Sequence, residues 1–193
     1  SVRHPGLNPS QPVFSNLYLS NGTTVASVPA YGTTHGQAFG PTPDGSALWT
    51  AAGGGSGSAL NRNYYEEFVV STKPGFGATI DSIILNASFY NSSSGTRFAI
   101  VYSKSGFAED SANVTGGYGP SGLLVDGANG AFATPVLLAN QKGVNTNNYR
   151  FALNQSEGIV IGAEETLTVR MYFSCGSTSS GRYAKLKDVQ IKG

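Results

Sequence analysis

The sequence predicts an all-β fold, a two-sheet antiparallel β-sandwich of jelly-roll type with negligible helix. Apolar and polar residues alternate over several stretches, which is the period of a strand with one buried face. The 26 glycines and 9 prolines are spread along the chain and divide it into short segments. About ten strands separated by turns are typical of a sandwich or a barrel. Two kinds of face recur, one strongly apolar and one mixed polar and aromatic, and this favours the sandwich.

Length and composition predict one domain spanning residues 1–193, in which residues 1–12 are a linker or entry segment. A chain of 193 residues lies in the range of a single all-β domain. Ten Phe and ten Tyr, within a hydrophobic content of 39%, are enough to fill the space between two sheets. Only 12% of the residues are charged, about half the usual share. Ser, Thr, Asn and Gly must therefore supply most of the polar surface.

Charge and hydropathy exclude several classes of partner. A net charge of +1 without a run of Lys or Arg lacks the basic surface that nucleic-acid binding needs. No stretch approaches 18 consecutive apolar residues, so we expect no membrane insertion. The single cysteine, Cys175, can form no disulfide within the chain. From this composition we expect a secreted or cell-surface protein.

The first third of the chain has few clear strands. Residues 13–19 alternate loosely and predict an outer strand, whereas residues 29–44 predict a long loop. Residues 46–52 predict a short apolar strand that carries the only tryptophan, Trp49. The GGGSG tract at 53–57 then ends that strand.

Residues 64–72 form the first well-defined strand, with alternate residues on two faces. Phe68 and Val70 mark the core side. The residues on the core side are Tyr64, Glu66, Phe68 and Val70, and those on the opposite side are Tyr65, Glu67 and Val69.

Residues 80–91 and 96–104 predict a β-hairpin closed by the turn-rich segment 92–95. The apolar faces consist of Ile83, Leu85, Ala87 and Phe89 in the first strand and Phe98, Ile100 and Tyr102 in the second. A slip of one residue would bury Arg97, so the register is well specified.

The rest of the chain predicts a loop at 106–122 and short strands at 123–125, 132–138, 149–153 and 158–161. Residues 166–174 alternate well, with Leu167, Val169, Met171 and Phe173 inward. In the last segment, 182–192, the residues Leu186, Val189 and Ile191 share a face only if the strand contains a β-bulge.

Three stretches together resemble a known kind of domain: LNRNYYEEFVVSTKPG at 60–75, TRFAIVYSKSGF at 96–107 and LTVRMYFSCGSTSSGRYAKLKDVQIKG at 167–193. They are similar to the jelly-roll accessory domains of secreted bacterial multidomain proteins, many of them polysaccharide degraders. The resemblance implies a module like the carbohydrate-binding modules or lectin-like sandwiches, sometimes with a structural calcium ion. Its motifs are mostly core and turn positions, which specify fold better than function.

Sugar recognition requires a flat aromatic face for the apolar side of a pyranose and a few planar hydrogen-bonding groups for its hydroxyls. The outward faces of segments 80–91, 96–104 and 166–174 offer Asn86, Tyr90, Arg97, Arg170 and Tyr172. These side chains form one polar-aromatic platform if the three strands are neighbours. The alternative is an ordinary solvated face, on which Arg97 and Arg170 pair with Glu67 or Asp81.

Two further aromatic residues are candidates for sugar binding. Trp49 precedes the glycine-rich tract and is either a rim residue that stacks on sugar or a core residue, which is the commoner position of a strand tryptophan. Tyr118, in the sequence GGYGPSG, is either an exposed binding residue or a turn residue packed on the sheet edge.

The sequence assigns no catalytic residue. Glycoside hydrolysis needs two carboxylates at a set separation, and the adjacent pairs 66–67 and 164–165 point to opposite faces or begin a strand. Glu67 with Asp81 or Asp188 is a weaker combination. His35, near Tyr31, could act as the base of a lyase, although a loop histidine at a solvated turn is the more ordinary interpretation.

We therefore expect a noncatalytic carbohydrate-binding module that targets a secreted enzyme to polysaccharide or oligosaccharide and is covalently linked to other domains of a larger secreted protein. We expect no required cofactor. A structural calcium ion is left open, with Asp110, Asp126 and Asp188 as loose candidate ligands. The alternatives are a structural or adhesin domain of a cell-surface protein, and a small jelly-roll glycoside hydrolase or polysaccharide lyase.

Overall fold

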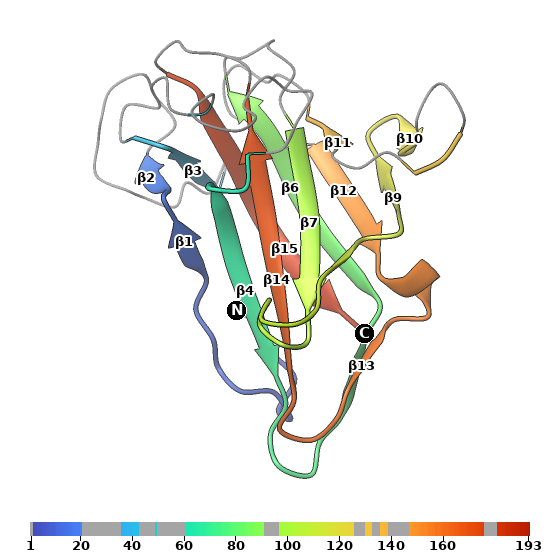
Figure 1. The fold of residues 1–193 in the computed structure, drawn as a ribbon. Helices are drawn as coiled ribbons and strands as arrows, with labels where there is room; N and C mark the ends of the chain where they lie inside the picture. The colour runs from blue at the N-terminus through green and yellow to red at the C-terminus, as the bar shows by residue number, and fades with distance from the viewer. Residues whose placement is uncertain are drawn as a thin grey trace.

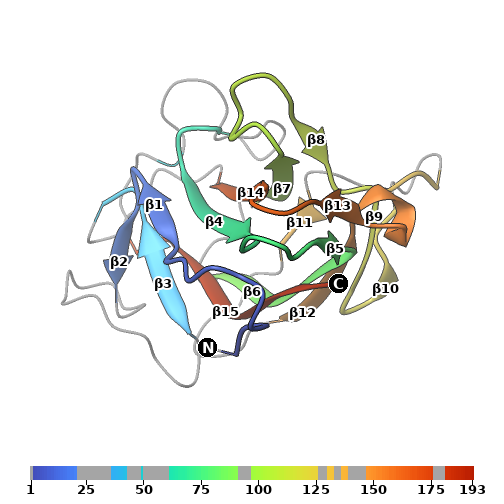
Figure 2. The same ribbon diagram turned by 90° about the horizontal axis from the view of Figure 1, so that it is seen from below.

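The computed structural model describes residues 2–20, 36–42, 49, 61–90, 97–125, 130–132, 136–138, 147–175 and 181–193. These residues form a two-sheet antiparallel β-sandwich of jelly-roll type, as predicted (Figures 1 and 2). The described ranges contain no α-helix, and Asn154–Ser156 is a single 3-10 turn. No helix within them has the length and apolar character needed to cross a membrane.

The first sheet lies in front in Figure 1. Its strands within the described residues are, in order, β1 (Val13–Ser15), β4 (Tyr65–Ser71), β14 (Thr166–Ser174), β7 (Arg97–Ser103) and β11 (Val136–Leu137), with β8 (Ala112–Asn113) also paired with β7. The second sheet lies behind it, with the order β10 (Gly122–Leu123), β9 (Gly116–Gly119), β12 (Asn147–Ala152), β6 (Ser82–Tyr90), β15 (Tyr183–Lys192), β3 (Gln37–Gly40) and β2 (Tyr18–Ser20). A two-stranded ribbon at one end joins β5 (Ala78–Ile80) to β13 (Ile159–Ile161).

The long strands pass alternately from one sheet to the other along the chain, as in a jelly roll. The predicted hairpin of residues 80–91 and 96–104 is therefore wrong. β6 pairs with β12 and β15, whereas β7 pairs with β14, β8 and β11. Two strands that face each other across a core show the same alternation as two that lie side by side. Hydropathy alone cannot distinguish these arrangements.

The inward faces of the two sheets meet in one core, at the positions that alternation predicted. The fully buried residues there include Ile83, Leu85, Ala87 and Phe89 of β6, Phe98 and Ile100 of β7, and Leu167, Val169, Met171 and Phe173 of β14. The ring centroid of Phe173 lies 4.9 Å from that of Phe98 in its own sheet and 4.9 Å from that of Phe39 in the opposite sheet. Interlocked rings of this kind hold the two sheets together.

One carboxyl group is buried in this core. Glu66 lies on the inner face of β4, opposite Phe14 of β1 and Met171 of β14, and its exposed fraction is 0%. Within the described part of the chain, neither of its carboxyl oxygens has a hydrogen-bond partner. Burial raises the pKa of Glu66 from its ordinary value of 4.5 to about 8, because the charged form loses its hydration. The side chain is therefore mostly protonated at neutral pH.

The last strand contains the predicted β-bulge. The register of β15 against β6 shifts between Lys187 and Gln190, and Asp188 within the bulge has a φ of 54°. The extra residue brings Val189 and Ile191 onto the core side with Leu186.

Two segments that the sequence predicts as loops contain strands, namely β3 in 29–44 and β8 and β9 in 106–122. β9 pairs with β12 and consists of Gly-Gly-Tyr-Gly. A Cβ atom at Gly119 would lie 2.9 Å from Leu124 and 3.1 Å from Tyr149, so this close approach requires glycine. Because glycines give no hydropathy alternation, this strand has no signal in the sequence.

The N-terminal segment lies against the end of β4. Leu7 forms a β-bridge with Thr72, the Asn8 N–H donates to the Ser71 carbonyl at 2.9 Å, and the Lys73 N–H donates to the Gly6 carbonyl at 2.9 Å. The expected entry segment is thus hydrogen-bonded to the sandwich. The residues that follow form edge strands of both sheets. β1 pairs with β4 at the edge of the first sheet, and β2 pairs with β3 at the edge of the second.

Candidate binding surface

Polar and aromatic side chains gather on the outer face of the first sheet. Antiparallel pairing places Tyr65 of β4 beside Tyr172 of β14, and Glu67 beside Arg170 in the next row. On the other side of β14, Ala99 and Val101 of β7 lie opposite Tyr172 and Arg170. Directly opposed residues in such pairs have their side chains on the same face. The small residues of β7 therefore leave the aromatic and charged groups standing above the sheet.

Arg170 is the most tightly held residue of this surface. Its Nε donates to Glu67 Oε2 at 2.7 Å, and the two side chains are 23% and 21% exposed. Its guanidinium carbon lies 4.6 Å from the ring centroid of Tyr65 and 4.0 Å from that of Phe107. Partial burial lowers the pKa of Arg170, but the bond to Glu67 and the contacts with Tyr172 and Tyr65 outweigh it, so this pKa rises above its ordinary value. The guanidinium is therefore charged and fixed in orientation.

A second guanidinium lies at the next ring. Arg62, in the turn before β4, has its guanidinium carbon 5.3 Å from the ring centroid of Tyr172. Tyr172 in turn contacts Tyr65, with ring centroids 5.3 Å apart and planes tilted by 58°. Tyr172 is only 4% exposed, whereas Arg62 is exposed and Tyr65 is partly exposed. We call the set of Arg62, Tyr65, Glu67, Phe107, Arg170 and Tyr172 the outer-face patch.

A tight turn after β7 presents Phe107 to this patch. Ser103 Oγ accepts the Phe107 N–H at 2.7 Å and donates to Asp110 Oδ1 at 2.8 Å. Asp110 also accepts the backbone N–H groups of Ser105 and Lys104, at 2.8 Å and 2.9 Å. Hydrogen bonds from the Ser105 hydroxyl first, then from the Lys104 N–H and the Ser103 hydroxyl, hold the pKa of Asp110 below its ordinary value of 3.8. They also support Phe107 in a left-handed backbone conformation with a φ of 69°.

Replacement of Asp110 by alanine is expected to lower the melting temperature, because three donors of the turn lose their acceptor. The stabilisation by Asp110 is present above its ordinary pKa and is lost as the pH falls below it, since the folded state depresses this pKa. The loss on Asp110→Ala should therefore shrink at acid pH. Calorimetric melting curves at several pH values measure both effects.

The matched control is Glu109→Ala, which changes the adjacent acidic residue. Glu109 contributes to the turn through its backbone N–H, which donates to Ser105 Oγ and is kept in the alanine variant. An equal loss of stability in both variants, or a loss for Asp110→Ala that is independent of pH, would contradict this role of Asp110.

The structure divides the predicted platform between the two sheets. Arg170 and Tyr172 of β14 lie in the outer-face patch, and Arg170 pairs with Glu67, as the alternative of a solvated face predicted. Arg97 lies in the same sheet, partly exposed and opposite Ser174. Asn86 lies in the second sheet, where its amide donates to Asp188 at 3.2 Å. Tyr90 is the last residue of β6, also in the second sheet, and the structure describes its backbone only.

The two other predicted aromatic residues are not in the outer-face patch. Tyr118 is 60% exposed and lies on β9, near the edge of the second sheet. Trp49 has no exposed surface, because its ring packs against Phe89 and Tyr64 and its Nε1 donates to the Arg182 carbonyl at 2.8 Å. Of the two positions that the sequence allows for Trp49, the structure has the core position. A ring in this place offers no face to a sugar.

The acidic residues considered for catalysis or calcium do not come together in the described ranges. Glu165 pairs with Lys104 at 2.8 Å, and this bond and that of the Gly162 N–H lower its pKa. Asp188 lies on the second sheet, so it cannot share a substrate with Glu67. The described residues contain no group of three His, Cys, Asp or Glu that could hold a metal ion. Asp126, His35 and Tyr31 lie outside the described residues.

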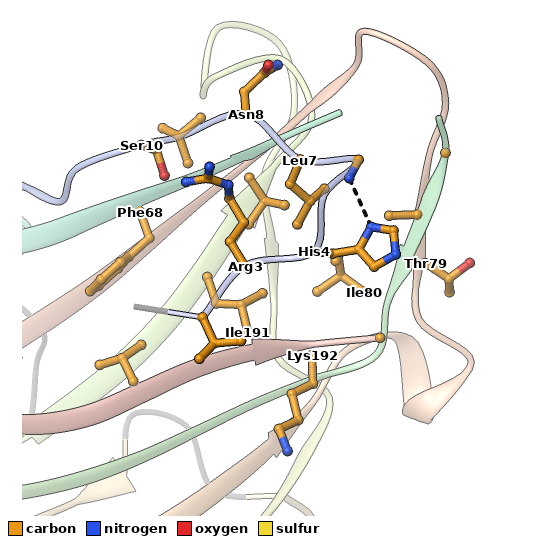
Figure 3. A pocket seen from close by; sticks show the side chains of 18 residues that line it. Arg3, His4, Leu7, Asn8, Ser10, Phe68, Thr79, Ile80, Ile191 and Lys192 are labelled. Atoms are coloured by element: carbon orange, nitrogen blue, oxygen red, sulfur yellow. Dashed lines mark hydrogen bonds between the residues drawn. The ribbon is translucent and has the colours of Figure 1, made fainter. Parts of the chain in front are cut away.

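A groove of about 560 Å³ lies between the N-terminal segment and the ends of β4 and β15 (Figure 3). Its apolar lining includes Phe68, Val70, Ile80, Val189 and Ile191, and its polar lining includes Arg3, His4, Asn8, Ser10, Thr79 and Lys192. The volume fits a small ligand. No Asp or Glu is among the lining residues, so the groove does not offer the carboxylate pair of a glycosidase. Phe68 is the only Phe, Tyr or Trp among its described lining residues, which suits sugar stacking less than the outer-face patch does.

Sequence reasoning missed two members of the outer-face patch, Arg62 and Phe107, as binding residues, and it placed Tyr65 and Glu67 on the outward face without connecting them to Arg170. The signal for Tyr65 and Glu67 was the alternation in 64–72, but their proximity to Arg170 depends on the pairing of β4 with β14. Phe107 follows a glycine in a turn and has no periodic signal. Comparison of the chain with protein-family models, with curated proteins and with solved structures finds no match.

Proposed function

We propose that this protein is a noncatalytic binding module for polysaccharide, and that the outer-face patch is its binding site. The observation that supports this most is the position of the Arg170 guanidinium, fixed by Glu67 and in contact with the rings of Tyr65 and Phe107. A partly exposed aromatic ring next to an oriented planar donor is the combination that sugar recognition needs. Because these groups are already held in place, binding costs little side-chain entropy.

The arrangement favours binding over cleavage. Glu67 is the only carboxylate of the outer-face patch, and it is engaged by Arg170. A hydrolase would need a second carboxylate across the glycosidic bond. We propose further that the module belongs to a larger secreted protein and needs no cofactor. The retention experiment includes a chelator, so that it also tests whether binding depends on a structural calcium ion.

The first experiment is retention of the purified chain on a panel of immobilised plant and algal polysaccharides, with and without a chelator, combined with an assay for released reducing ends. The expected result is retention without release. Release of reducing ends would replace the proposal with a hydrolase or a lyase. No retention on any glycan would leave the structural or adhesin domain as the function.

Tyr65→Ala tests the site itself and is expected to weaken retention about tenfold, which corresponds to ~1.4 kcal/mol, because it removes a stacking ring and one contact of Arg170. The matched control is Tyr118→Ala, which removes the same kind of ring from the second sheet. Affinity electrophoresis in gels that contain the retained polysaccharide measures both. If Tyr118→Ala weakens retention and Tyr65→Ala does not, the site lies on the second sheet.

A further inference from the structure

We infer that the outer-face patch selects polysaccharides that carry anionic groups, such as the carboxylate of a uronic acid or a sulfate ester. This inference rests on the proposed function and names the substrate class for the same site. It follows from the charges and contacts of the arginines around the two tyrosine rings.

The charges of the patch do not balance. Arg62 and Arg170 both belong to it, and Glu67 is its only acidic member. Glu67 pairs with Arg170 at 2.7 Å, and its single negative charge offsets only one of the two guanidinium charges. The outer-face patch therefore has a net positive charge, although the whole chain has a formal charge of only +1.

Arg62 is the residue that most directly suggests an anionic ligand. It is exposed and touches the ring of Tyr172, and in the described part of the chain it forms no ion pair. A guanidinium has five donors in a fixed fork, which matches the two oxygens of a carboxylate or a sulfate. A neutral sugar would satisfy these donors only through single bonds to hydroxyls. An acidic sugar that stacks near Tyr65 would bring its anionic group within reach of Arg62.

The rings beneath the cations strengthen this selection. Aromatic faces fix each guanidinium by cation–π contact and exclude water from one side of it. Charge-assisted hydrogen bonds at such a partly desolvated site are stronger than neutral ones. The preference for an anionic ligand should decrease with ionic strength, because the patch is exposed to solvent.

The test compares four oligosaccharides by titration calorimetry: an oligogalacturonate, its methyl ester, a sulfated galactose oligomer and a neutral galactose oligomer. The expected result is that the oligogalacturonate or the sulfated oligomer binds at least about tenfold more tightly than its neutral counterpart, which is the range of a hydrogen bond to a charged group. The anionic oligomer that binds more tightly shows whether the patch recognises the carboxylate of a uronic acid or a sulfate ester.

Arg62→Gln should abolish this difference by weakening the anionic oligomer about tenfold, while the neutral oligomer keeps its affinity. The matched control is Arg150→Gln, which removes the same charge from an exposed position on β12 of the second sheet and should change neither affinity. An equal loss in both variants would indicate general charge attraction and overturn the site assignment.

Two other outcomes separate this inference from the proposed function. Equal affinity for charged and neutral oligomers, lost with Tyr65→Ala, would overturn the anionic selectivity and leave polysaccharide binding intact. Absence of binding to all four oligomers and to the polysaccharide panel would overturn both. A loss of affinity for the neutral oligomer in Arg62→Gln would show that Arg62 only supports Tyr172, which also contradicts the inference.

Discussion

The stability of the folded protein should fall as the pH rises from 4.5 to 8, and Glu66→Gln should remove most of that fall. Glu66 has an exposed fraction of 0%, and burial raises its pKa from 4.5 to about 8. Between these values the folded state holds a proton that the unfolded state has released. The unfolded state therefore gains relative stability with each step in pH. The contribution is complete below pH 4.5 and is lost by the time the pH passes 8.

The expected size of this effect is large for one residue. Each unit of pKa difference corresponds to about 1.4 kcal/mol, so a rise from 4.5 to 8 lowers the free energy of unfolding by about 5 kcal/mol. That is a substantial part of the stability of an ordinary domain. Denaturant unfolding of the wild type and of Glu66→Gln at intervals from pH 4.5 to 9 measures it as the difference between the two curves.

Two further variants define the cause. Glu66→Met should be more stable than the wild type at pH 8, because it removes a buried group that has no hydrogen-bond partner in the described residues. Glu109→Gln makes the same chemical change as Glu66→Gln at an exposed position and should retain the pH dependence of the wild type. If Glu66→Gln retains it as well, the carboxyl group of Glu66 is hydrated in solution and the inward placement of its side chain is wrong.

The sequence placed Glu66 on the core face of its strand, because alternation within one strand is local information. The same information located the core residues of β14, the inward faces of β6 and β7, and the bulge that brings Val189 and Ile191 to the core side. In each case a single strand decides which residues point inward, and the cost of burying the wrong set fixes the register.

The neighbours of each strand were not predictable in this way. β6 and β7 follow each other in the chain but lie in different sheets, and β4 meets β14 across about a hundred residues of sequence. For this reason the predicted platform is divided in the structure, with Asn86 in the second sheet and Arg170 in the first. Contacts that depend on a turn, such as that of Phe107 with Arg170, are also invisible to periodicity.

Trp49→Ala should cost about 3–5 kcal/mol in the free energy of unfolding, the range of large aromatic truncations in a core. Its ring centroid lies 5.1 Å from that of Phe89 and 5.6 Å from that of Tyr64, and its Nε1 donates to the Arg182 carbonyl. Alanine at this position leaves a cavity beside two rings and a carbonyl without its donor. Unfolding in guanidinium chloride followed by circular dichroism measures the loss, since the variant has no tryptophan to report fluorescence.

Trp49→Phe and Tyr118→Ala complete the test, because Trp49 is also a candidate for sugar stacking on sequence grounds. Trp49→Phe keeps a ring but loses the indole N–H, so it should be intermediate in stability and should bind polysaccharide like the wild type. Tyr118→Ala changes an exposed ring and should alter stability by less than about 0.5 kcal/mol. If Trp49→Phe loses glycan retention while its stability is unchanged, Trp49 faces the ligand and its core position is wrong. If Trp49→Phe loses stability but is still fully retained on the glycan, Trp49 is a core residue that joins the first and second sheets.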